Sequence, residues 1–115
     1  MPKHRLLTEF GIGSSLRRRD YTAAARRAVQ DALWRNSINL AELFGQPKEA
    51  MLIDVEIAVQ RPGEVDCEAL KEVFPYGDVT VTASEGGLDI PRPDGEPTVI
   101  ANAAINVSLM LERAP

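Results

Sequence analysis

The sequence EFGIGSSLRRRDYTAAARRAVQDALWR, residues 9–35, joins the end of a strand, two spaced glycines, three arginines and an amphipathic helix. We interpret Gly11 and Gly13 as a turn through which the strand leaves its sheet, and Asp20 as the N-cap of the helix. An Asp at an N-cap accepts a free backbone N–H of the first helical turn, which typically contributes about 1 kcal/mol. A small-molecule site, if the chain has one, is expected in this strand–turn–helix unit.

The predicted helix has an apolar side and a polar side. Its apolar residues recur at helical spacing and are rich in alanine, which lets the helix backbone approach a sheet closely. We expect the helix to lie on a sheet and to end near Asn36 and Ser37. The apolar side consists of Tyr21, Ala25, Ala28, Val29 and Ala32, and the polar side of Arg26, Arg27, Gln30, Asp31 and Arg35.

Strand patterns account for most of the remaining chain. Alternating apolar and polar residues predict strands at 51–60, 79–84 and 98–111, and a short apolar run predicts a first strand at 6–12. A short helical cluster is expected at 38–44, a second helix is expected after Asp66, and residues 85–97 read as a loop. The order predicts one α+β domain over residues 1–115. Its architecture would be a βαβαββ two-layer sandwich in which a mixed sheet has helices on one face.

The second face of that sheet would be polar, because it would present Asp54, Glu56, Thr80, Asn102 and Asn106. Such a face is either solvated or shared with other copies of the chain. A domain of this size buries only about two-thirds of its unfolded surface, so it gains by association. We expect an oligomer, with a trimer that closes three sheets into a barrel as the leading arrangement.

Composition bounds the function. The chain has 115 residues, 44% of them hydrophobic and 26% charged, as in ordinary globular domains. A net charge of −4 argues against nucleic-acid binding, which needs clustered basic residues. No apolar run approaches the roughly 20 residues of a membrane span, and no signal peptide is recognisable. We expect a cytoplasmic protein without membrane or nucleic-acid partners.

The arginine run is the leading candidate for a binding site. Arg17, Arg18 and Arg19 precede a helix N-terminus, where free N–H groups and the helix dipole also favour anions. The rival interpretation is that these arginines pair with Asp54 and Glu56 of a neighbouring subunit, or simply face water. The glycine pair is not a dinucleotide fingerprint, because Leu16 takes the place of the third glycine. The candidate ligand-binding residues are Gly11, Gly13, Ser14, Ser15, Arg17, Arg18, Arg19, Asp54 and Glu56.

Catalytic groups are sparse. His4, in the terminal segment, is the single histidine, which excludes a Ser-His-Asp triad within one chain and argues against a zinc site. Cys67 is the single cysteine and reads as a packed residue. Asp54 and Glu56 would lie about 7 Å apart on one strand face, so they could also serve as an acid/base pair. We predict no metal and no cofactor.

Residues Thr8–Gly13 and Asp20–Thr22, with Val55–Val59 and the closing strand, resemble a small family of conserved hypothetical proteins from bacteria and plants. That family has an N-terminal G-x-G-x-D-x-H-G hallmark and no settled activity. Gly11 and Gly13 match it, whereas Ser15, Arg17 and Arg18 stand where the family has Asp, His and Gly. The resemblance therefore does not supply this chain with an acid, a base or a metal ligand at these positions.

The order of elements is also similar to one repeat of the ring-opening amidohydrolases and to the trimeric chorismate-mutase-like fold. These resemblances imply ligand sites between neighbouring sheets and, for the amidohydrolases, a serine nucleophile activated by a lysine. Ser84, before Gly86 and Gly87, loosely matches that serine, but no lysine can be placed beside it.

Two hypotheses follow. In one, an oligomer binds an anionic or cyclic imide-like molecule at subunit interfaces, with Ser84 or Glu9 assisting in a hydrolase-like reaction. In the other, the chain is a non-catalytic subunit of a hetero-oligomer with a motif-complete paralogue.

Overall fold

The domain is built on a single mixed β-sheet. The computed structural model describes residues 2–35 and 45–111, and its five strands are ordered β1-β5-β2-β3, with the short β4 also paired to β5. Only β2 and β3 are parallel. The strands are β1 (Lys3–Ser15), β2 (Leu52–Val59), β3 (Asp78–Glu85), β4 (Leu88–Ile90) and β5 (Thr98–Met110).

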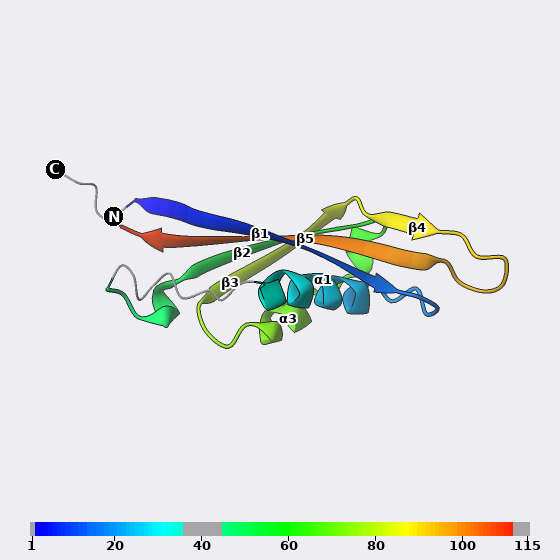
Figure 1. Ribbon diagram of the computed structural model, residues 1–115, viewed down its shortest axis with the longest axis horizontal. Helices are drawn as coiled ribbons and strands as arrows, with labels where there is room; N and C mark the ends of the chain where they lie inside the picture. Colours follow the sequence, from blue (N-terminus) through cyan, green and yellow to red (C-terminus); the bar gives the residue numbers. More distant parts are fainter. Residues whose placement is uncertain (1, 36–44, 112–115) are drawn as a thin grey trace.

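The helices cover one face of this sheet. Helix α1 (Tyr21–Arg35) and the short α3 (Cys67–Leu70) lie on the same side in Figure 1, with 3-10 turns at Lys48–Ala50, Pro62–Glu64 and Lys71–Val73. Alternate strand residues point into the layer between sheet and helices, as the period of two predicts. The buried strand residues are Ile53, Val55, Ile57, Val59, Val81, Val99, Ala101, Ala103, Ile105, Val107 and Leu109. The predicted α+β class and the one-sided helical layer are confirmed; the chorismate-mutase-like fold and the trimer stay predictions.

Helix α1 follows its predicted pattern. The five residues of the predicted apolar side, from Tyr21 to Ala32, are all buried, and Ala24 joins them. The Asp20 carboxylate accepts the Ala23 N–H at 2.9 Å, so the predicted N-cap is present. Asp66 caps α3 in the same way, accepting the Ala69 N–H at 3.1 Å. The predicted end of α1 at residues 36 and 37, and the predicted helical cluster at 38–44, lie outside the described residues.

The two glycines do not form a turn, contrary to the sequence interpretation. Strand β1 continues through Gly11 and Gly13 to Ser15. A Cβ atom at Gly11 would lie 2.0 Å from the Ala28 carbonyl oxygen, and one at Gly13 would lie 2.3 Å from the Ala24 carbonyl oxygen. The glycines are therefore needed because the α1 backbone rests directly on β1, and the chain turns only beyond Ser15.

The predicted loop at 85–97 contains an additional strand. Strand β2 pairs with residues 102–108 of β5, which leaves the start of β5 without a neighbour on that side. Leu88–Ile90 fills this place by pairing with residues 98–100. Three residues flanked by Gly87 and Pro91 give too short a pattern to identify from sequence. In the described ranges, no helix has the length and apolar character needed to cross a membrane.

Candidate anion-binding site

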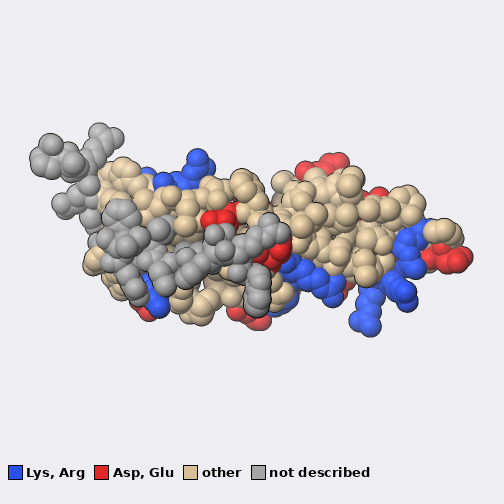
Figure 2. All heavy atoms as spheres, in the orientation of Figure 1, with Lys and Arg blue, Asp and Glu red and all other residues tan. Residues whose placement is uncertain are grey.

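A surface pocket of about 700 Å³ opens where β1 gives way to α1. Its walls come from the loop between them and from the first two turns of the helix. Figure 2 shows Lys and Arg side chains gathered at this end of the molecule, at the lower right. The lining residues are Ser14, Ser15, Leu16, Arg17, Arg18, Asp20, Ala23 and Arg27.

The loop that carries the arginines is fixed at both ends. On the β1 side, the Leu16 carbonyl accepts hydrogen bonds from the Thr98 hydroxyl at 3.0 Å and from Arg92 at 3.4 Å. On the helix side, the buried Ser15 hydroxyl accepts the Asp20 N–H at 3.2 Å. Arg19 turns the chain between them with a positive φ of 47°. Arg17 and Arg18 are thus presented from an anchored loop.

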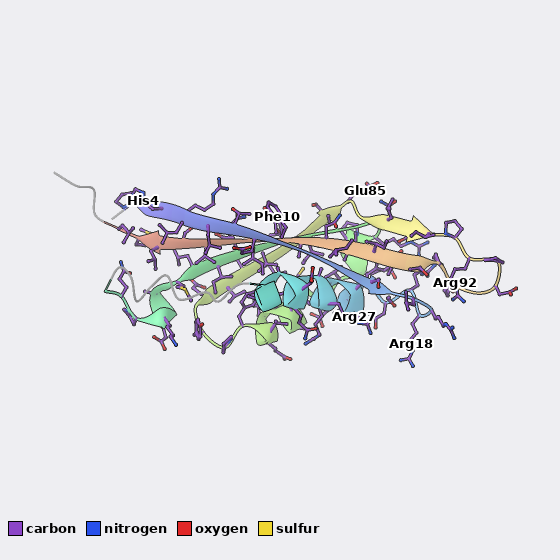
Figure 3. All side chains as sticks on the ribbon, in the orientation of Figure 1. His4, Phe10, Arg18, Arg27, Glu85 and Arg92 are labelled. Carbon is purple, nitrogen blue, oxygen red and sulfur yellow. The ribbon has the colours of Figure 1, made fainter. Side chains whose placement is uncertain are left out.

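The arginines around the pocket differ in what they contact. Arg27 donates to the Ser14 carbonyl, and Arg19 lies 3.4 Å from the Glu96 carboxylate. Arg17 and Arg18 are exposed and form no hydrogen bond or ion pair with residues 2–35 or 45–111. Figure 3 shows Arg18 and Arg27 at the same end of the molecule, with Arg92 close by. Two guanidinium groups at the pocket are therefore available to a ligand.

The helix N-terminus contributes less than the sequence suggested. Asp20 itself lines the pocket, and its carboxylate already accepts one of the first free N–H groups of α1. Its negative charge offsets part of the positive helix end. An anion here would be held mainly by guanidinium groups and by the Ser14 and Ser15 region, rather than by helix amides.

Asp54 and Glu56 lie elsewhere. They belong to the sheet face that faces away from the helices, which we call the open face. Asp54 forms an ion pair with Lys3 at 2.8 Å, and Glu56 accepts a hydrogen bond from Asn106 at 3.3 Å. Neither carboxylate contacts the arginine loop within the described chain. Gly11 and Gly13 were also predicted to bind the ligand. In the structure they pack directly against the backbone of α1 and do not line the pocket.

Ser84 and Glu9 are not brought together. Glu9 pairs with the buried Ile105, so it lies on the helix side of the sheet, whereas Ser84 pairs with Ala58 on the open face. Strands β1 and β3 are also separated by β5 and β2, a distance of roughly 14 Å. Ser84 lines an open-face hollow of about 270 Å³ together with Glu56 and Asn102. No lysine or histidine is among the described residues that line it.

One buried polar pair was not foreseen. The Tyr21 hydroxyl donates to the Asp89 carboxylate of β4 beneath the start of α1. Burial first, and then the hydrogen bond to Asp89 and its negative charge, raise the pKa of Tyr21 to about 12. The other Asp89 oxygen, Oδ1, is buried without a partner among the described residues. The sequence signal for this pair was the apolar–acidic–apolar alternation Leu88–Asp89–Ile90 inside the predicted loop.

Metal ligands do not gather in residues 2–35 and 45–111: no three His, Cys, Asp or Glu side chains lie close enough to hold an ion.

The comparisons with known proteins give a family and a fold. Residues 5–107 match the model of a family described as conserved hypothetical protein, Lin0512 family. The chain is similar to a solved structure from Nostoc punctiforme, described as an FtsZ-like protein of unknown function. The identity is 31% and the TM-score 0.85, over 95% of this chain and 98% of that one. No curated protein matches the chain.

Proposed function

We propose that this chain, which belongs to the Lin0512 family of conserved hypothetical proteins, binds a small anionic molecule in the pocket between β1 and α1. The observation that carries the proposal is the pair Arg17 and Arg18. Both side chains line a pocket of about 700 Å³ and have no partner among the described residues. The ligand class is a phosphate or carboxylate compound, because guanidinium groups bind both in a bidentate manner.

Charge placement supports an anion rather than a neutral ligand. Like charges on adjacent residues repel, and the remaining pocket carboxylate, Asp20, is engaged with the Ala23 N–H. Glu96, which also carries a negative charge, lies against Arg19. A bound anion would relieve the repulsion between Arg17 and Arg18 without displacing any contact that the fold uses.

The anion site is complete within one chain, so its function does not require the predicted subunit boundary. A hydrolase-like role for Ser84 is not part of this proposal. The Ser84 hollow lies on the open face, and its described lining offers the serine no base other than Glu56, which is hydrogen-bonded to Asn106. The partner-subunit alternative is left as a prediction: co-expression with a motif-complete paralogue would test it.

The test is ligand-induced thermal stabilisation. A ligand that binds only the folded state stabilises it by about 2.7 kcal/mol at 100 times its dissociation constant. We expect inorganic phosphate or a dicarboxylate, compared with chloride at equal ionic strength, to raise the melting temperature of the parent protein in a saturable way. Replacing Arg17 and Arg18 together with alanine should remove that saturable increase and leave the fold intact, because both side chains are exposed.

The control is a double variant in which Lys48 and Lys71 are replaced with alanine. It removes the same number of positive charges, but at positions outside the pocket. It should keep the saturable response. Phosphate also stabilises proteins by exclusion from their surfaces, but that effect does not saturate and is common to all variants. If the arginine variant and the parent respond equally, the anion site is not at this pocket.

A further inference from the structure

The open face of the sheet carries a patch of large apolar side chains. Phe10 is 68% exposed, Ile12 55%, Leu88 58% and Ile90 43%. The strand register places all four on the open face, because they pair with Ala104, Asn102, Ile100 and Thr98 rather than with the buried residues between them. Phe10 and Ile12 lie on β1 and Leu88 and Ile90 on β4, with β5 between the two strands. Large apolar side chains exposed on one sheet face in this way typically mark an interaction site.

Phe10 projects from this face between two hollows. Figure 3 shows its ring on the side of the sheet away from α1. On one side lies the hollow of about 270 Å³ whose floor includes Ala58 and Ala104, and on the other side a hollow of about 230 Å³ beside Ile12. The face therefore has a protruding phenyl ring and, beside it, a hollow lined by small residues. A surface of this kind is complementary to itself.

From this geometry we infer that the open face binds a second copy of this chain, with Phe10 of each copy seated in the alanine-floored hollow of its neighbour. The hollow lies beside Phe10, over β5 and β2, and Ser84 of β3 lines its far side, so this contact places β1 of one copy over β5 and β2 of the next. The inference is independent of the proposed anion site, which lies on the helix side of the sheet.

Charge follows the same arrangement. On the open face, β1 carries Lys3 and Arg5, whereas β2 carries Asp54 and Glu56. Lys3 already pairs with Asp54 of its own chain at 2.8 Å, so charge complementarity between copies rests on Arg5 and Glu56. Laying β1 of one copy over β2 of the next places the strand that carries Arg5 over the strand that carries Glu56, which favours this arrangement over one in which the two β1 strands overlap. Arg5 is exposed, so it can reach a carboxylate of the neighbour.

The area suits a weak, reversible contact. Strands β1 and β5 have 13 residues each, a length of roughly 43 Å, whereas β2 and β3 have 8 residues each, roughly 26 Å, and the four strands span roughly 14 Å between the outer axes. The resulting flat area of about 500 Å² lies below the roughly 800 Å² per partner of a standard interface, so we expect a micromolar association.

Association through the β1 edge is hindered by the chain itself. Asp31 of α1 accepts the Ile12 N–H at 3.0 Å, and Arg27 donates to the Ser14 carbonyl. These side chains occupy backbone groups that an added strand would need, as proteins commonly do at sheet edges. The β1 edge is therefore less available to a second copy than the open face.

The experiment compares the parent protein with Phe10→Lys and Leu16→Lys by sedimentation velocity between about 1 and 100 µM, over which a micromolar association is resolved. Leu16 is a matched control because it is 63% exposed but lies off the open face, on the loop after β1. We expect an oligomeric parent, an oligomeric Leu16→Lys variant, and at least about thirtyfold weaker association of Phe10→Lys, the loss typical of an interface anchor.

A mass of two chains would mean reciprocal insertion of Phe10, and a mass of three would mean the cyclic arrangement predicted from the sequence; either supports the inference if Phe10→Lys dissociates. If Phe10→Lys does not fold, Ser84→Arg tests the same contact, because a large charged side chain would block the hollow that receives Phe10 and should weaken association. Ser84 is exposed on the edge strand β3, so this variant should fold. A monomeric parent at the highest concentration would overturn the inference and leave the face to another partner. An oligomer that both variants leave unchanged would overturn it as well.

Discussion

Replacing Gly13 with alanine should destabilise the protein strongly, although it adds only one methyl group. The new Cβ would lie 2.3 Å from both the Ala24 carbonyl oxygen and the Ala28 nitrogen, whereas real Cβ atoms essentially never approach closer than 3.0 Å. Since the obstructing atoms are helix backbone, α1 as a whole must move by about 0.7 Å or more. Such a movement would loosen the buried alanine side of the helix.

The cost follows from overpacking, which typically amounts to 1–3 kcal/mol when the surroundings can adjust. We expect about 2 kcal/mol or more here, because the contacts are with backbone on two sides. Urea unfolding at equilibrium measures it as a lowered midpoint with an unchanged slope. Gly63→Ala is the control: its Cβ would meet nothing within 4 Å, so it should be neutral or slightly stabilising. A Gly13→Ala variant within about 0.5 kcal/mol of the parent would show that close helix packing does not explain the glycines.

Two further predictions concern the N-terminal end of α1. Tyr21 should ionise near pH 12 rather than near 10, because its folded pKa is raised, so the stability it contributes is complete below pH 10 and is lost as the pH rises toward 12. Tyrosinate absorbance of the folded protein should lose this late step in Tyr21→Phe, and an unshifted titration would contradict the buried pair with Asp89. Asp20→Asn should keep the N-cap, since Asn caps as well as Asp, yet remove a negative charge from the pocket. Phosphate should then bind about two- to fivefold more tightly by calorimetry, the effect of one exposed charge contact; weaker binding would mean that Asp20 positions the ligand.

The sequence predicted the elements whose periodicity is long and regular. Strand β2 and the alternating β5 were expected almost to the residue, and the N-caps at Asp20 and Asp66 are in place. These features are local, because a strand that packs on one face must alternate and a cap needs only its own helix. The helical layer on one side of the sheet then follows, because the apolar side of the helix and the apolar face of the strands must be buried against each other.

The features that sequence reasoning missed depend on neighbours in space. Gly11 and Gly13 looked like a turn because the helix backbone that excludes a Cβ there comes 11 to 21 residues later in the chain. Strand β4 forms because β5 extends beyond β2, and the three-residue alternation at 88–90 is too short to predict it. The sequence placed Asp54 and Glu56 on the polar face, where they lie, but it did not show that Lys3 and Asn106 contact them there. Their pairing with arginines of a neighbouring subunit stays a prediction.

Strand β1 shows why the two proposed surfaces do not compete. Its residues alternate, so Gly11, Gly13 and Ser15 face the helix while Phe10 and Ile12 face away from it. Gly11, Gly13 and Ser15 are small because α1 packs directly on them. This close packing also lets Arg27 donate a hydrogen bond to the Ser14 carbonyl at the end of the strand. The outward residues are large and apolar, although no part of the described helices covers them. A change at Gly13 should therefore disturb the anion pocket by moving α1, whereas a change at Phe10 should alter association and leave the pocket intact.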